Sequence, residues 1–572
     1  MAIRDPRGRS GVIEFAEKNP VKVGLFFAAL SIVTKLAHIR FGFPYHLNPD
    51  EQYILKDPFK IAFMYATGNF SSGTNLLFWV LAIYFGGVFA FGRALGTWHG
   101  FGEFKDLIVT ESPKLILCGR VFCVLCAGAA IVVLYRALTK LLPDTRLRLL
   151  AIATLALSPI DLMSTAWLKF DGPAFLVNAV VMLHIVTYVV DVDDARPRRR
   201  AYLVALLACS LRPDFAVVPL ALFVFDLWQR RPLRPIVAPV AAGLAGYALI
   251  TLAPVASLYR HTIGRSKGMW VAASFEQNIM RTPPGDLTLG DYVARNLVFY
   301  AVIFLAFGPV IVAAFWPTAR RQRAWWIFLG AGVLFVLPLL VFHANGTRYA
   351  LIPSAYFVFA AALALSVVAS SWVRYGTFAL GLLFAGALSV QASVALWRDE
   401  DPRLAAGRYV LAHTRPDEVV AMEGYLNAGM HAEIAECPEE LALKAAAVKE
   451  AGNGTGETFR LLSLAKPEVC RFILEVGEED RFAQSSQRGK LIATFASVSA
   501  DTLPRYFTAS IQYLPPEANV PPAFAATIGQ SYELASLFER HSNDIRLRTL
   551  LRGTPYDNRV YVYHRKGTPT DP

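Results

Sequence analysis

Residues 167–190 read WLKFDGPAFLVNAVVMLHIVTYVV. The part from Pro173 to Val190 contains no Asp, Glu, Lys or Arg, and about 20 mostly apolar residues are enough for a helix to cross the hydrocarbon core of a bilayer. Lys169 and Asp171 stand immediately before this run. The stretch therefore predicts a membrane-spanning helix that begins at a loop carrying both a cation and an acid.

The same pattern recurs along the first 400 residues. The stretch 201–228 is also apolar, but Leu211-Arg212-Pro213-Asp214 interrupts it and predicts two shorter helices. Only 17% of the 572 residues are charged, against about 25% in soluble proteins. The sequence predicts a polytopic α-helical membrane protein with about 11 transmembrane helices. The further apolar runs are 23–39, 115–138, 148–166, 235–256, 297–316, 325–342, 349–368 and 377–397.

The basic residues indicate which loops face the cytoplasm. One set of segments is nearly three times as dense in Lys and Arg as the other, so the positive-inside rule makes it cytoplasmic. The basic residues behind the net charge of +12 thus lie mostly in loops between apolar runs, as in membrane proteins. We therefore expect no nucleic-acid partner. The basic set comprises 1–22, 136–148, 191–200, 229–234, 317–324 and 369–376, and the outer set 39–75, 95–114, 167–172, 257–296 and 343–348.

This assignment requires that the apolar segment 76–94 does not cross the membrane. We therefore predict that it is embedded within a long first outer loop, 39–114. Residues 1–22 are then the cytoplasmic N-terminus, and 23–397 form the membrane body. A second long outer loop, 257–296, could close over bound substrates, because loops of this length are usually functional.

After Trp397 the charge density becomes ordinary and no further apolar span follows. Short runs of strand-forming residues and one helical stretch predict a soluble mixed α/β domain over 398–572, on the outer side of the membrane. Cys437 and Cys470 could pair there or remain thiols. The predicted strands are 419–422, 459–465, 491–498 and 560–563, and the predicted helix is 439–450.

Ionisable residues gather at the predicted outer ends of the spans, where they are costly and therefore informative. The acids are Asp50 and Glu51, after the first span, and Asp171. Each could simply cap a helix. The cations are Arg120, Lys169, Arg212 and Arg348, and each alone could be an anchor at the membrane interface. Together they predict one outer face that holds an anionic headgroup beside a carboxylate.

The order of these motifs resembles the GT-C glycosyltransferases that use polyprenyl-phosphate sugars, in particular the branch of the protein O-mannosyltransferases and aminoarabinose transferases. The resemblance covers roughly residues 20–397, including Arg120 at the start of a span. His46 stands three residues before Pro49 rather than beside it, and the C-terminal domain matches no module of the family known to us, which leaves the acceptor open. The motifs are Pro49-Asp50-Glu51-Gln52-Tyr53, Lys169-Phe170-Asp171-Gly172-Pro173 and Thr347-Arg348-Tyr349-Ala350-Leu351-Ile352-Pro353.

The resemblance implies an inverting transfer from a polyprenyl-phosphate sugar in the outer leaflet of the inner membrane to an extracytoplasmic glycan, lipid or protein. Asp50 would be the general base, and Glu51 would hold it or the helices of the first outer loop. Asp171 would orient the acceptor, or share a divalent metal ion with Asp50. The donor phosphate would be bound by Arg348, Arg212, Lys169 and Arg120, and the substrates contacted by His46, Tyr53, His343 and Tyr349.

Two other functions remain open at this level. A flippase or transporter for a polyprenyl-linked lipid could use the same anionic-headgroup site, although charges near mid-bilayer and inverted repeats would then be expected. A non-catalytic membrane scaffold could retain the residues of a lost active site. The resemblance also includes enzymes of the same fold that transfer an oligosaccharide to protein. Those relatives usually carry a WWD-type motif in the soluble domain, and residues 398–572 contain none.

Overall fold

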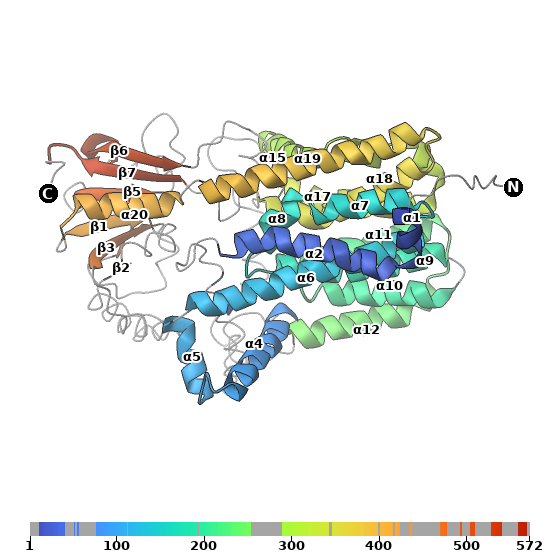
Figure 1. Cartoon of the computed structure of the whole chain (residues 1–572), viewed down its shortest axis with the longest axis horizontal. Coiled ribbons are helices and arrows are strands. Elements are labelled where there is room, and N and C mark those ends of the chain that lie inside the picture. The colour runs from blue at the N-terminus through green and yellow to red at the C-terminus, as the bar shows by residue number, and fades with distance from the viewer. Residues whose placement is uncertain are drawn as a thin grey trace.

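The computed structural model of the chain combines a large helical body with a β-sheet region that follows it (Figure 1). The structure describes residues 11–40, 51, 54–55, 76–110, 112–191, 194–252, 289–341, 346–398, 401–415, 418–423, 435–436, 470–477, 492–494, 504–509, 528–539 and 559–568.

Long apolar helices run side by side through the body (Figure 1). Among the described residues, six helices are long and apolar enough to cross a membrane, or up to eight if each bent pair counts as one span. The chain is therefore a multi-pass membrane protein, while the number of about 11 crossings stays a prediction. The main long helices are α2 (Pro20–Ile39), α6 (Ser112–Leu141), α9 (Asp171–Val190), α17 (Arg323–Val341), α18 (Leu351–Ser366) and α19 (Ser371–Arg398).

Several predicted spans are broken, and the breaks fall at proline or glycine. The run 148–166 forms two helices bent by 42°; Ser158 caps the second by accepting a hydrogen bond from the Asp161 amide, and Pro159 opens it. Gly308 has a φ of 53° before Pro309, a conformation that glycine adopts without strain. The shorter body helices are α1 (Gly11–Lys18), α7 (Thr145–Ala156), α8 (Pro159–Thr165), α12 (Val237–Tyr247), α15 (Leu289–Phe304) and α16 (Pro309–Ala314).

The predicted interruption near 211–214 is confirmed. Helix α10 (Ala195–Ala208) ends before it, a short 3-10 turn η1 (Pro213–Ala216) follows, and α11 (Val217–Trp228) leads away. Pro213 opens the turn, where its missing amide and fixed φ are tolerated. The turn leaves Arg212 at the apex between the two helices, in an extended backbone conformation.

Helix α4 (Leu76–Ala94) and helix α5 (Phe101–Thr110) form a V beside the body, and α4 is steeply inclined to α6 (Figure 1). Trp98 packs so closely on Gly92 that a Cβ there would lie 1.9 Å from the indole ring. By length and composition alone α4 could cross a membrane. Its embedded, non-crossing position stays a prediction, which the steep inclination favours.

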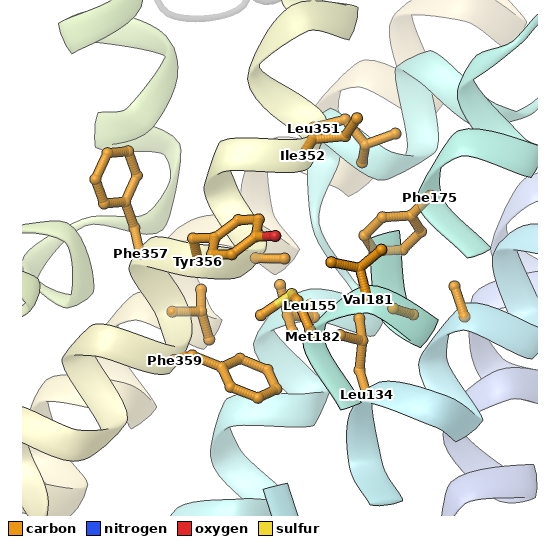
Figure 2. Packing of buried hydrophobic residues seen from close by; sticks show 14 of the residues in the cluster. Leu134, Leu155, Phe175, Val181, Met182, Leu351, Ile352, Tyr356, Phe357 and Phe359 are labelled. Atoms are coloured by element: carbon orange, nitrogen blue, oxygen red, sulfur yellow. The ribbon is translucent and has the colours of Figure 1, made fainter. Parts of the chain in front are cut away.

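Helix α18 lies at the centre of the body. Every residue from Leu351 to Leu365 is buried, as expected for a helix that is apolar on all sides. Figure 2 shows Tyr356 and Phe359 of this helix near Leu155 of α7 and Met182 of α9. The 3-10 turn η6 (Thr347–Ala350) precedes α18 directly, so this packed core fixes the position of the turn.

The region after α19 holds helix α20 (Pro402–His413) and a seven-stranded mixed sheet. The predicted strands at 419–422 and 560–563 are confirmed, and β4 forms at the start of 491–498. The predicted strand 459–465, the helix 439–450 and Cys437 lie outside the described residues. The strands are β1 (Val419–Glu423), β2 (Ala435–Glu436), β3 (Cys470–Gly477), β4 (Ile492–Thr494), β5 (Tyr506–Ala509), β6 (Tyr532–Glu539) and β7 (Arg559–Arg565).

The sheet has the order β2-β3-β1-β5-β7-β6, with β4 paired to β3. Strands β1 to β5 are parallel to their neighbours within this group, and β7 is antiparallel to both β5 and β6. Helix α20 begins four residues after α19 ends and packs beside β7 and β6. The sheet therefore stands at the end of the body where α19 ends (Figure 1).

Candidate active site at one end of the helical body

Charged side chains from distant parts of the sequence meet at the end of the body where α19 leads to the sheet. Here α2 ends, α6 begins, α8 turns into α9, and the apex at 212 and the turn η6 lie. We call seven side chains here the outer-end cluster, after the outer face that the distribution of basic residues predicts. They are Glu51, Arg120, Lys169, Asp171, Arg212, Arg348 and Tyr349.

Glu51 and Arg120 form a buried two-point ion pair. The Arg120 Nε donates to Glu51 Oε1 at 2.8 Å and its Nη2 donates to Oε2 at 2.6 Å, a strong and geometrically specific arrangement. The Leu168 amide also donates to Glu51 Oε1, at 2.8 Å. Arg120 Nη1 donates to the Ile39 carbonyl, and its guanidinium lies 4.7 Å from the centre of the Trp167 ring. This pair therefore joins Glu51 to the end of α2 and to the loop before α9.

Asp171 opens α9 at a point where two helices touch. A Cβ at Gly172 would lie 2.5 Å from the Cys123 carbonyl oxygen of α6. Because that oxygen belongs to the backbone, a larger residue would separate the helices. The Cys123 thiol in turn donates to the Lys169 carbonyl at 3.4 Å. The missing side chain at Gly172 thus brings the start of α9, with Asp171, close to Cys123 of α6.

Arg212 has two carboxylate partners. Its Nη1 donates to Asp171 Oδ1 at 3.1 Å. Its Nε and Nη2 donate to the two oxygens of Asp214, at 3.2 and 2.6 Å. The exposed fractions of these side chains are 5% for Asp171, 13% for Arg212 and 36% for Asp214. Arg212 therefore joins a buried acid to an acid that faces the solvent.

Tyr349 places the two predicted phosphate-binding arginines close together. The Arg212 guanidinium carbon lies 5.9 Å from the centre of the Tyr349 ring, and that of Arg348 lies 4.9 Å from it. Arg348 Nη2 also donates to the tyrosine hydroxyl, at 2.9 Å. Distances of this size permit attraction between a cation and an aromatic face. Two guanidinium groups are thus held around one ring.

The structure brings together most of the predicted site residues that it describes. Arg120 pairs with Glu51, while Asp171, Arg212, Arg348 and Tyr349 form one continuous set of contacts. Lys169 is buried in the loop between these two groups, with 7% of its surface exposed. His46, Asp50, Tyr53 and His343 lie outside the described residues. Within the described part, no three metal-ligating side chains gather as they would around an ion.

Sequence reasoning did not single out a second buried ion pair, Lys35 with Asp161. Lys35 Nζ lies 2.6 Å from Asp161 Oδ2, and both side chains are 1% exposed. Ser31 and Thr165 donate to the two oxygens of Asp161, at 3.3 and 2.9 Å. The sequence did carry a signal for this pair, since each residue is a charge inside an apolar run. Such charges rarely stay without a partner in a membrane protein.

A different carboxylate cluster lies at the other end of the body. Asp226 is fully buried and accepts hydrogen bonds from Arg198 Nε at 2.8 Å, the Tyr202 hydroxyl at 2.9 Å and the Tyr188 hydroxyl. Asp171 opens α9, whereas Tyr188 lies in its last turn, so the two clusters are a helix length apart. We call Asp226, Arg198, Tyr202 and Tyr188 the inner-end cluster, after the inner face that the basic loops predict.

Comparison with known proteins gives a likeness in fold. No protein-family model matches the sequence, and no protein of curated function matches it. Two crystal structures of ArnT from Cupriavidus metallidurans, one bound to undecaprenyl phosphate and one in the apo state, are each similar to 94% of this chain over 97% of their own. Their sequence identity to it is 13%, and the TM-scores are 0.47 and 0.45.

Proposed function

We propose that this chain is an integral membrane glycosyltransferase. It moves a sugar from a polyprenyl-phosphate donor to an extracytoplasmic glycan, lipid or protein of the cell envelope. The observation that supports this proposal is the outer-end cluster, in which a buried acid, Asp171, and two arginines, Arg212 and Arg348, meet at one end of an apolar helical body. Charge-assisted donors of this kind suit a phosphate headgroup at a membrane surface.

The donor phosphate is the leaving group in the proposed reaction. As the bond between the anomeric carbon and the phosphate oxygen breaks, negative charge grows on the phosphate. Fixed guanidinium groups stabilise that charge without having to reorganise. We assign this role first to Arg348 and then to Arg212, with Lys169 as a third cation. Arg120 takes a supporting role here, because Glu51 and the Ile39 carbonyl already occupy its donors.

The base in this mechanism is Asp50. The acceptor hydroxyl oxygen attacks the anomeric carbon from the face opposite the phosphate, which inverts the configuration, and Asp50 takes the hydroxyl proton. The products are the glycosylated acceptor and a polyprenyl phosphate. Glu51 is next to Asp50 in the chain, and its two-point pair with Arg120 anchors that segment. Asp171 orients the acceptor, with His46, Tyr53, His343 and Tyr349 as further substrate contacts.

The position in the cell belongs to the same proposal. The active site and residues 398–572 lie on the extracytoplasmic side of the plasma membrane, because the basic loops indicate that the other side is cytoplasmic. Helix α20 and the sheet stand at the end of the body where α19 ends (Figure 1), which is the end with the outer-end cluster, and there they can recognise the acceptor.

Mass spectrometry of cell-envelope glycans and glycoproteins tests the proposal. Cells with and without the gene are compared, and the deleted strain is complemented with the wild type, Asp50→Asn or Glu14→Gln. Glu14 pairs with Lys18 on an exposed surface of α1, so Glu14→Gln removes one negative charge away from the site. We expect one sugar modification to vanish on deletion and to return with the wild type and Glu14→Gln only. A modification that Asp50→Asn restores fully would contradict the enzymatic role and favour a flippase or a scaffold.

A further inference from the structure

We infer that Asp214 is the resting counter-ion of Arg212 and that the phosphate of the lipid displaces it. This inference rests on the proposed function, because it concerns how the same site admits its phosphate. Its starting point is that Arg212 has two carboxylate partners that differ in both geometry and exposure. No role was expected for Asp214 from the sequence beyond its place in the interruption.

The geometry separates the two partners. Asp214 occupies Arg212 Nε and Nη2, the edge of a guanidinium that receives two oxygens of a carboxylate or a phosphate side by side. Asp171 occupies Nη1 only. A phosphate that takes the two-point edge must therefore replace Asp214, while the contact with Asp171 can remain. Arg212 would stay anchored in the site during this exchange.

The difference in burial decides which acid leaves. The Asp214 side chain is 36% exposed and that of Asp171 is 5% exposed. A carboxylate near the solvent regains its hydration when it separates, and exposed pairs contribute little to stability. A buried carboxylate that loses its partner is left uncompensated, which is strongly unfavourable. Asp214 is thus the partner that can be replaced at small cost.

The charges support an exchange rather than a simple addition. Arg212 and Arg348 carry two positive charges, and Asp171 and Asp214 carry two negative charges within the same set of contacts. A phosphate that replaces Asp214 keeps this balance. The donor is a phosphodiester, whereas the leaving polyprenyl phosphate is a monoester that can bear a second charge. Asp214 therefore competes less well with the product phosphate than with the donor phosphate, and it remains displaced until the product leaves.

Binding of undecaprenyl phosphate to the purified full-length protein in detergent tests this inference. The variants are Asp214→Asn, Asp214→Ser and the distant charge control Glu14→Gln. We expect both changes at 214 to tighten binding by about twofold to fivefold, the range that corresponds to a partly exposed ion pair. Glu14→Gln should bind like the wild type. Thermal unfolding of each variant verifies that it is folded.

The possible results separate the inference from the function. Binding that is unchanged or weaker in both 214 variants, with intact binding by the wild type, overturns the counter-ion role alone. A folded wild type that binds no undecaprenyl phosphate overturns the proposed function and this inference with it. A parallel titration with inorganic phosphate distinguishes a lipid-phosphate site from a general one, and tightening only for inorganic phosphate also contradicts the inference.

Discussion

Asp226 and Asp171 are buried acids at opposite ends of the body, and each is paired with an arginine. They differ in the number of hydrogen bonds that the carboxylate accepts. Asp226 receives hydrogen bonds from Arg198, Tyr188 and Tyr202. The Asp171 side chain has one hydrogen bond in the described part of the chain, from an arginine that Asp214 also holds. A carboxylate with several internal donors serves the fold, whereas one with spare acceptor capacity can serve a ligand.

The two ends also differ in what their charges connect. Tyr188, Arg198 and Asp226 belong to α9, α10 and α11, so the inner-end cluster holds three neighbouring helices together. At the outer end, Arg212 and Tyr349 lie in the apex and in a 3-10 turn. Residues on such connections carry function more often than residues inside helices. We therefore expect substitutions in the inner-end cluster to change stability and substitutions in the outer-end cluster to change the proposed reaction.

The largest expected effect is on activity at the outer end. Asp171→Asn should lower the rate of sugar transfer by about 100-fold, the size of effect expected when an acceptor is no longer held in the reacting position. The unfolding temperature should change little, because the asparagine keeps its shape and a polar oxygen. The measurement is a transfer assay on purified protein, normalised to the folded fraction. Full activity in this variant would contradict the expected role of the outer-end cluster in the reaction.

The matching change at the inner end should act on stability instead. Asp226→Ala leaves Arg198 buried without its acid, and breaking a buried pair in this way costs about 3–5 kcal/mol. We expect a clearly lower unfolding temperature and less folded protein in the membrane. Activity per folded molecule should remain close to that of the wild type. A stable variant without activity would show that the inner end takes part in the reaction.

A third change concerns the pair Lys35–Asp161, which sequence reasoning missed. Lys35→Met alone leaves Asp161 buried without its lysine and should also cost several kcal/mol, about the same as other broken buried pairs. The double variant Lys35→Met with Asp161→Leu removes both charges and should regain most of that loss. Thermal unfolding of the two single variants and the double variant measures the coupling. Additive losses would mean that the two charges do not stabilise each other.

The smallest expected effect comes from one hydrogen bond between α2 and α19. His38 Nε2 and the Ser393 hydroxyl are 2.9 Å apart, and Ser393→Ala should cost about 1 kcal/mol. Thermal unfolding should show a small decrease, with sugar transfer unchanged. A decrease as large as that of Asp226→Ala would indicate that this contact belongs to a larger polar network.

Much of this arrangement could be predicted from the sequence, because its signals are local. Apolar length and basic loops indicated the spans and their ends, and Arg212-Pro213 marked the interruption. Placing Asp171, Arg212 and Arg348 at one end followed from short loops between spans. The bend at Ser158-Pro159 had a local signal as well, a cap followed by proline, although the run 148–166 was predicted as a single span.

The choice of partners could not be predicted, because it depends on how helices pack. Arg120 was expected at the phosphate, yet Glu51, 69 residues away, pairs with it. Lys35 and Asp161 are 126 residues apart, and nothing local in the sequence indicates that α2 and α8 meet. Asp214 is the converse case, because it lies only two residues from Arg212. Its importance depends on how exposed it is, which the sequence does not reveal.

The length of α19 sets how far the sheet stands from the lipid. Its 28 residues extend for about 42 Å at 1.5 Å per residue, whereas the hydrocarbon core is about 30 Å thick. Even at a typical tilt of about 20°, roughly 10 Å of helix remains outside the hydrocarbon core, shared between the two ends of α19. We therefore expect the sheet to stand clear of the hydrocarbon core, where a large acceptor could approach the proposed site from the side.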